Sequence, residues 1–123
     1  MQVKPLSNSS ERRFLDSLES VAYENLASPD FNASELARKL HVGRTTLAKK
    51  MKELVGMSPA DYISACRFRK CLELLKESDL SIGEISYKCG FRNQSYFNLK
   101  FKERFGRLPR QVREEKPEET AKQ

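Results

Sequence analysis

The sequence is poor in the residues that most catalytic and metal sites use. Its 123 residues include no tryptophan and one histidine, His41, which is too little for a His-based triad or a typical zinc site. Cys66, Cys71 and Cys89 are odd in number and lack C-x-x-C spacing, so we expect reduced thiols. No nucleophile–base pair or phosphate-binding loop is visible. We therefore expect no enzymatic activity, no catalytic or metal-binding residue, no cofactor and no small-molecule substrate.

Long apolar runs are also missing. No stretch approaches the roughly 18 apolar residues that span a bilayer, and the opening MQVKPLSNSS has no apolar core of a secretion signal. We expect a cytoplasmic protein, or one on the cytoplasmic side if the chain forms part of a membrane sensor. Residues 114–123 (EEKPEETAKQ) have no apolar periodicity and are expected to be a disordered tail.

Charge, in contrast, is plentiful and unevenly placed. The net charge is +6, yet residues 11–30 contain five acidic and only two basic residues. Residues 44–53 contain four basic residues and one acidic residue, and residues 92–107 contain five basic residues and one acidic residue. Cations clustered on two segments indicate a polyanionic partner. Two solvated helix faces are the alternative interpretation.

The apolar spacing predicts helices and no alternating strand pattern. The segment SSERRFLDSLESVAYENLA has a helical apolar stripe and is expected to be ended by Pro29. A long helix is expected over residues 59–77, with Ser58 as its N-cap and Pro59 at the first helical position.

A second feature is a repeated unit. Asn32 and Ser81 each stand three residues before a glutamate, which predicts a capping box opening a short helix. Gly43 and Gly90 are expected to break these helices after about two turns, and a basic amphipathic segment follows each break. The two units align at an offset of 49 residues before the break and 50 after it, so the second turn has one extra residue. Each unit is predicted to be a helix-turn-helix, whose second helix enters the major groove of DNA.

The outward face of the first basic helix is expected to read bases. On a helical wheel, Leu47 and Met51 fall on one side and Thr45 and Lys49 on the opposite side. The leucine and methionine are expected to belong to the core. Arg44, at the N-terminal end, is also expected to reach a base.

The second basic helix has one exception to this pattern. Phe97 and Phe101 form its predicted buried side, Ser95 and Leu99 lie opposite, and Asn98 stands at the margin. Leu99 is therefore apolar on a face that should be polar. It either packs on a neighbour or contacts a thymine methyl in the groove, and the pattern leaves both alternatives open.

Further cations near both helices are expected to neutralise phosphates without reading sequence. The expected phosphate contacts are Lys50, Lys52, Arg92, Lys100 and Lys102. The long middle helix, at 19 residues, is about 28 Å long, and one turn of B-DNA is about 34 Å. A helix of this length is expected to place the two recognition helices in successive major-groove segments.

Two runs, ELARKLHVGRTTLAKKMKELVGMSPADYI and IGEISYKCGFRNQSYFNLKFKERFGRLP, strongly resemble the DNA-binding domain of the AraC/XylS transcription regulators. The resemblance covers about residues 31–112, and GMSPADYI and CGFRNQSYFNLKFKERFG are its most specific pieces. It implies an all-α domain of seven helices, with two helix-turn-helix subdomains joined by the long helix. It also implies binding to double-stranded DNA near promoters and, usually, activation through contact with RNA polymerase.

In this family, exposed positions of both recognition helices contact bases. The matching positions here are Thr45, Ala48, Lys49, Ser95, Asn98 and Leu99. The chain departs from the family pattern at three positions. Leu99 stands where a basic residue is common, Val112 where an aromatic residue often closes the last turn, and Gly43 where a serine commonly caps the helix. Glycine is tolerated as an N-cap, so Gly43 in place of serine is expected to lower the stability of this helix by only about a few tenths of a kcal/mol.

The predicted domain covers residues 11–113, after a linker over residues 1–10. Its helix-turn-helix units are expected at about 32–56 and 81–106. The family normally carries a second domain for sensing or dimerisation, and about 30 residues before the first unit leave no room for one. We expect a fragment of a longer regulator, for example the output domain of a hybrid two-component sensor. A stand-alone short regulator is the alternative.

Two other classes of function are alternatives to sequence-specific DNA binding. RNA or single-strand binding requires exposed aromatic residues between cations, whereas Tyr62, Tyr87 and Tyr96 are expected to pack in the interior. A helical protein-interaction module or a non-specific nucleic-acid binder is the remaining alternative. It predicts no affinity for DNA, or affinity that ignores sequence.

Overall fold

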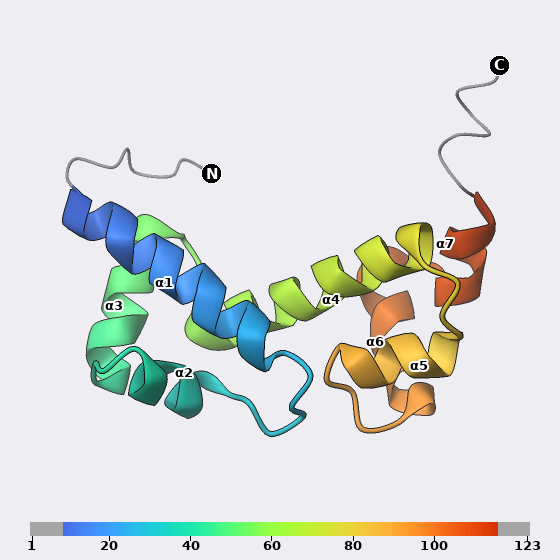
Figure 1. Cartoon of the computed structure of the whole chain (residues 1–123), viewed down its shortest axis with the longest axis horizontal. Helices are drawn as coiled ribbons and strands as arrows, with labels where there is room; N and C mark the ends of the chain where they lie inside the picture. The colour runs from blue at the N-terminus through green and yellow to red at the C-terminus, as the bar shows by residue number, and fades with distance from the viewer. Residues whose placement is uncertain (1–8, 116–123) are drawn as a thin grey trace, which may run out of the picture. The chain divides into compact units, whose positions relative to one another are not determined.

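The computed structural model describes residues 9–115, which form seven α-helices and no strand (Figure 1). The helices are α1 (Ser9–Asn25), α2 (Ala33–Lys39), α3 (Arg44–Leu54), α4 (Pro59–Glu77), α5 (Ile82–Lys88), α6 (Gln94–Phe105) and α7 (Pro109–Glu115). The predicted all-α class and the number of helices are confirmed. The chain divides into two compact units between Cys66 and Arg67, inside α4.

Some helix ends differ from the sequence prediction. The first helix ends at Asn25, before Pro29, because a turn closed by a 3.1 Å hydrogen bond from the Ser28 amide to the Asn25 carbonyl follows it. The last helix includes Glu114 and Glu115, which were expected to be disordered. An ion pair between Arg107 and Glu115 ties that end of α7 to the preceding loop. The rest of the expected linker and tail, residues 1–8 and 116–123, lies outside the described residues.

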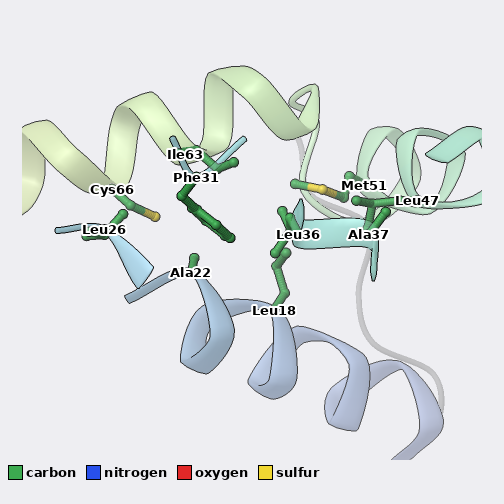
Figure 2. Close-up of a cluster of buried hydrophobic side chains, with 10 residues drawn as sticks. All are labelled: Leu18, Ala22, Leu26, Phe31, Leu36, Ala37, Leu47, Met51, Ile63 and Cys66. Atoms are coloured by element: carbon green, nitrogen blue, oxygen red, sulfur yellow. The ribbon is translucent and has the colours of Figure 1, made fainter. Parts of the chain in front are cut away.

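The first unit packs α1, α2, α3 and the first turns of α4 around one apolar core (Figure 2). The apolar stripe of α1 faces α2 and α3, as its spacing predicted. The buried members of this core are Leu18, Ala22, Leu26, Phe31, Leu36, Ala37, Leu47, Met51, Ile63 and Cys66. The core side of the first predicted recognition helix is thereby confirmed.

The second unit contains the rest of α4 with α5, α6 and α7, and its core is rich in phenylalanine. The buried members are Phe68, Cys71, Leu75, Ile85, Cys89, Phe91, Phe97 and Phe101. Ring centroids lie 5.5 Å apart for Phe68 and Phe91, and 5.0 Å apart for Phe91 and Phe97, in tilted arrangements. Tilted aromatic pairs of this kind contribute about 0.5–1.5 kcal/mol beyond the burial of their surface.

The long helix α4 contributes to both cores. Its first turn is capped by Ser58, whose hydroxyl oxygen accepts a 3.1 Å hydrogen bond from the Asp61 amide. Ile63 belongs to the first core and Leu75 to the second. The helix is continuous over its 19 residues, as predicted from the sequence.

Candidate nucleic-acid interface

The turns that follow α2 and α5 are built by the same three backbone hydrogen bonds. In the first turn the bonds run from Leu40 to Leu36 (3.0 Å), His41 to Arg38 (3.1 Å) and Val42 to Ala37 (3.1 Å). In the second they run from Cys89 to Ile85 (3.0 Å), Gly90 to Tyr87 (3.1 Å) and Phe91 to Ser86 (3.0 Å). Every donor and acceptor is offset by 49 residues, so the repeat in the sequence is also a repeat in backbone structure. The pattern resembles a Schellman ending, which forces one residue after the helix into the left-handed region.

The residue in that left-handed position differs from our prediction in the first unit. Gly90 has φ 90° and ends α5, as expected. Gly43, however, has φ −74° and serves as the N-cap of α3, so it does not break α2. The left-handed residue is His41, with φ 61°. The prediction at Gly43 was wrong because the turn requires the left-handed residue two positions earlier.

The two recognition helices, α3 and α6, begin differently. The Asn93 side chain caps α6 by accepting a 2.8 Å hydrogen bond from the Tyr96 amide. Gly43 gives α3 no side-chain cap. The extra residue of the second turn is Arg92, which stands between the left-handed turn and Asn93.

The short helices that precede the turns are also capped unequally. Around α5 the predicted capping box is complete: the Glu84 amide donates to the Ser81 hydroxyl (3.0 Å), and the Ser81 amide donates to the Glu84 carboxylate (2.9 Å). This second bond holds the pKa of Glu84 below its ordinary value. Around α2 only Asn32 caps, and the Glu35 carboxylate instead accepts from Arg38 (2.7 Å). The predicted box at Asn32 is therefore only half formed, because a cation one turn away competes for the carboxylate.

The outward face of α3 presents the side chains that the sequence predicted as base contacts. Arg44, Thr45, Ala48 and Lys49 are all exposed. Beside them lies an open groove of about 490 Å³. It is lined by Ala33, Arg44, Thr45, Leu47, Ala48, Ser58, Pro59 and Ala60. The start of α4 lies next to this face because of the packing of the unit, which residue spacing in the sequence does not reveal.

The outward face of α6 is partly apolar. Ser95 and Leu99 are exposed, and Leu99 retains 55% of its accessible surface. Asn98 is half-buried, and its side-chain oxygen is buried without a hydrogen-bond partner. A change of rotamer that turned Asn98 toward a groove would break no hydrogen bond at that oxygen.

Of the predicted phosphate contacts, Lys50, Lys52, Arg92 and Lys102 are exposed and Lys100 is half-buried. Two of the lysines make known contacts within the protein. The Lys50 ammonium lies 4.7 Å from the centre of the Phe14 ring, and Lys100 lies 3.3 Å from a carboxylate oxygen of Glu103. These two lysines must leave such contacts, or share them, to reach a phosphate.

The tyrosines depart from expectation. Tyr62 is half-buried, as predicted, but Tyr87 and Tyr96 retain 74% and 50% of their accessible surface. Tyr96 lies on the solvent side of α6 because Phe97 and Phe101 already occupy its core side, and its ring centre is 5.5 Å from the Lys100 ammonium. The prediction that all three pack in the interior was therefore wrong for two of them.

Within residues 9–115 no cluster of three or more histidine, cysteine, aspartate or glutamate side chains is arranged to hold a metal ion. Over the same range, no helix has the length and apolar character needed to cross a bilayer.

In a comparison with protein families, residues 36–115 match a helix-turn-helix domain family. Among curated proteins, the chain is 31% identical to histidine kinase P4 of Formosa agariphila over 91 residues, which is 74% of this chain and 7% of that protein. It is 29% identical to the HTH-type transcriptional activator RhaS of Escherichia coli (strain SE11), again over 74% of this chain and 33% of RhaS. The chain thus spans a third or less of both relatives.

Solved structures show the same fold. The C-terminal domain of the two-component response regulator YesN from Fusobacterium nucleatum superposes with a TM-score of 0.73 at 28% identity, covering 80% of this chain and 96% of that one. The DNA-binding domain of the global transcriptional factor AdpA, solved in complex with a target DNA, superposes with a TM-score of 0.72 at 27% identity, covering 80% and 88%.

Proposed function

The chain belongs to the AraC/XylS-type helix-turn-helix family of DNA-binding transcription regulators, and from this premise we propose how it binds DNA. Each unit inserts its recognition helix, α3 or α6, into the major groove of a specific duplex. The shorter helix before each turn, α2 or α5, crosses the sugar-phosphate backbone, as in other helix-turn-helix proteins.

The observation that carries this proposal is the repeated turn. Two chemically different sequences form the same three hydrogen bonds at an offset of 49 residues. After each turn comes a helix whose apolar side is buried and whose exposed surface includes lysine and arginine side chains. A packing role alone does not require cations on the outward face of both second helices.

The roles of individual side chains follow from their chemistry. Arg44 and Lys49 carry donors suited to the acceptor edge of guanine, and Thr45 and Ser95 carry hydroxyls that bond to several bases. Asn98, once turned outward, presents the paired donor and acceptor that match adenine. Ala48 is small enough to allow close approach of α3. The lysines and arginines assigned to phosphates (Lys50, Lys52, Arg92, Lys100 and Lys102) supply affinity that is independent of sequence.

The bound site is proposed to contain two blocks of specific bases, one for each recognition helix, in successive major-groove segments. Support comes from α4, whose 19 continuous residues give a length of about 28 Å. One chain then reads two half-sites, and the site need not be palindromic.

The larger protein is proposed to be a regulator with a further domain for sensing or dimerisation. The relatives are much longer than this chain, and they include a histidine kinase and a transcriptional activator. We place its action in the cytoplasm, as an activator that contacts RNA polymerase or as the output domain of a two-component sensor. Deletion of the gene region for this domain should then abolish transcription from promoters that carry the selected site.

The direct test is selection of bound sequences from a random duplex DNA library by the 123-residue chain, with affinities measured at two salt concentrations. Two enriched blocks about one helical turn apart are expected. A single enriched block contradicts the proposal that both recognition helices contact specific bases. Enrichment of no sequence contradicts specific duplex recognition and favours a protein-interaction module or a non-specific binder.

A further inference from the structure

The two recognition helices differ most in chemistry at one equivalent position. At the offset of 50 residues that aligns α3 with α6, Lys49 corresponds to Leu99. Both side chains are exposed, and both lie opposite the buried side of their helix. One helix therefore presents a long cation at this position, whereas the other presents a branched hydrocarbon.

Leu99 does not pack into the hydrophobic core of its own unit. It belongs neither to the buried residues of the second core nor to the partly buried apolar residues that pack against it. With 55% of its surface accessible, it is one of three large apolar side chains that residues 9–115 leave exposed. The first of the two alternatives from the sequence, packing on a neighbour, is therefore not the reason for a leucine here.

The surroundings of Leu99 favour nucleic acid over a protein partner. Ser95 is one turn before it on the outward face, and Lys102 is less than one turn after it; both are exposed. The nearby Glu103 carboxylate is paired with Lys100 at 3.3 Å, which reduces its repulsion toward phosphate. A stable protein interface buries about 800 Å² on each partner, and Leu99 together with the exposed Tyr96 three residues before it offers only a small part of that area.

We propose that Leu99 determines specificity by contacting the C5-methyl group of a thymine in the major groove. This inference rests on the proposed function and names the chemistry that one half-site must present. The thymine methyl is the apolar group that a base pair displays in the major groove, and apolar side chains distinguish it from the other base edges. The α6 half-site accordingly contains a thymine whose methyl, and not its hydrogen-bonding edge, is read.

The test uses the duplex that the wild-type chain selects from a random library, remade with deoxyuridine in place of one thymidine at a time. Uracil pairs as thymine does and lacks only the methyl group. At the contacted position, uracil should weaken wild-type binding about fourfold, the equivalent of about 0.8 kcal/mol for one buried methylene-sized group. Leu99→Ala should lose a similar factor on thymine DNA and lose nothing further on uracil DNA. Leu99→Met should bind like the wild type.

Two controls make the result interpretable. Lys49→Ala should keep the full sensitivity to uracil at the Leu99 position, because it acts on the other half-site. Circular dichroism should show unchanged folding of Leu99→Ala, since an exposed leucine adds little to the core and alanine is a better helix former.

Two results overturn the inference. One is Leu99→Ala binding every duplex as the wild type does. The other is an equal uracil effect in the wild type and in Leu99→Ala, which assigns the methyl contact to another residue. If the wild-type chain selects no sequence at all, the proposed function is wrong, and this inference is wrong as well. Two selected blocks without a methyl-sensitive thymine overturn only the inference.

Discussion

His41 and Gly90 occupy the same position in two turns 49 residues apart, and both have left-handed backbones, with φ of 61° and 90°. A residue with a Cβ costs roughly 1–2 kcal/mol in that conformation, and glycine costs little there. The turn after α2 therefore stores strain that the turn after α5 avoids.

Replacing His41 by glycine should stabilise the first unit. We expect a gain of about 0.5–1 kcal/mol, because the relief of left-handed strain exceeds the extra chain entropy that glycine loses on folding. Urea unfolding followed by circular dichroism measures the change. The matched variant Gly90→Ala should destabilise by about 1–2 kcal/mol. If His41→Gly is destabilised, the imidazole makes a contact whose stabilising free energy exceeds the cost of the left-handed backbone.

Arg113 should be the most sensitive position of α7. Its guanidinium donates hydrogen bonds to the carbonyls of Leu75 (3.1 Å), Ser78 (3.0 Å) and Leu80 (2.7 Å), and it lies 3.4 Å from that of Leu74. The carbonyls of Leu75, Ser78 and Leu80 end α4 or follow it, where no further helical turn satisfies them. The Leu74 carbonyl already accepts hydrogen bonds from the amide and hydroxyl of Ser78. Arg113→Met should therefore destabilise the second unit by about 2–3 kcal/mol.

The neighbouring Arg110→Met is the control for this prediction. Arg110 is an exposed residue of the same helix, so its replacement should change stability by less than about 0.5 kcal/mol. Arg113→Lys should recover only part of the loss, because an ammonium cannot match the fork of the guanidinium. Equal stability of the two methionine variants would contradict the capping role.

Lys49 and Lys102 should respond differently in DNA binding. Lys49→Ala should relax specificity at one or two base pairs by about 1–3 kcal/mol while changing non-specific binding little. Lys102→Ala should weaken specific and random duplexes alike and reduce the slope of log affinity against log salt by about one. Fluorescence anisotropy at several salt concentrations measures both. Equal losses on specific and random DNA for Lys49→Ala would rule out its base-reading role.

The capping box at Ser81 and Glu84 predicts a dependence of stability on pH. The hydrogen bond from the Ser81 amide lowers the pKa of Glu84 in the folded chain below its ordinary value of 4.5. A lowered folded pKa stabilises the fold above the ordinary pKa, and this contribution is lost as pH falls through the folded value. The stability difference between wild type and Glu84→Gln should therefore be largest near neutral pH and shrink below pH 4.5. A difference that stays constant from pH 7 to pH 3 would contradict the prediction.

The three thiols should resist alkylation in the folded protein. Cys66 is 3% exposed, and Cys71 and Cys89 are fully buried. The Cys71 thiol donates a hydrogen bond to the Cys89 sulfur, which raises the pKa of Cys71 and lowers that of Cys89. Iodoacetamide should label none of them quickly without denaturant and all three after unfolding, as judged by mass spectrometry. Rapid native labelling of Cys89 would reveal local opening of the turn after α5.

Local signals in the sequence predicted much of this structure. Ser81 and Glu84 are three residues apart and make both bonds of their box, and the offset between Leu36 and Ile85 already marked two equivalent helices. The buried sides of α3 and α6 followed from the spacing of Leu47 and Met51 and of Phe97 and Phe101. These features depend on neighbours within one or two turns of helix, so helical periodicity suffices to find them.

The remaining features depend on contacts that spacing does not encode. Arg113 reaches carbonyls 33 to 39 residues earlier in the chain, and the groove beside Arg44 exists only because the start of α4 packs next to α3. His41 is the left-handed residue because the hydrogen bonds of the turn require that conformation at its position, although a glycine, which adopts it at lower cost, stands two positions later. The sequence by itself determined which helices form and which side of each is apolar. Only the tertiary structure decided that Leu99 stays exposed, because Phe97 and Phe101 had already filled the core beneath α6.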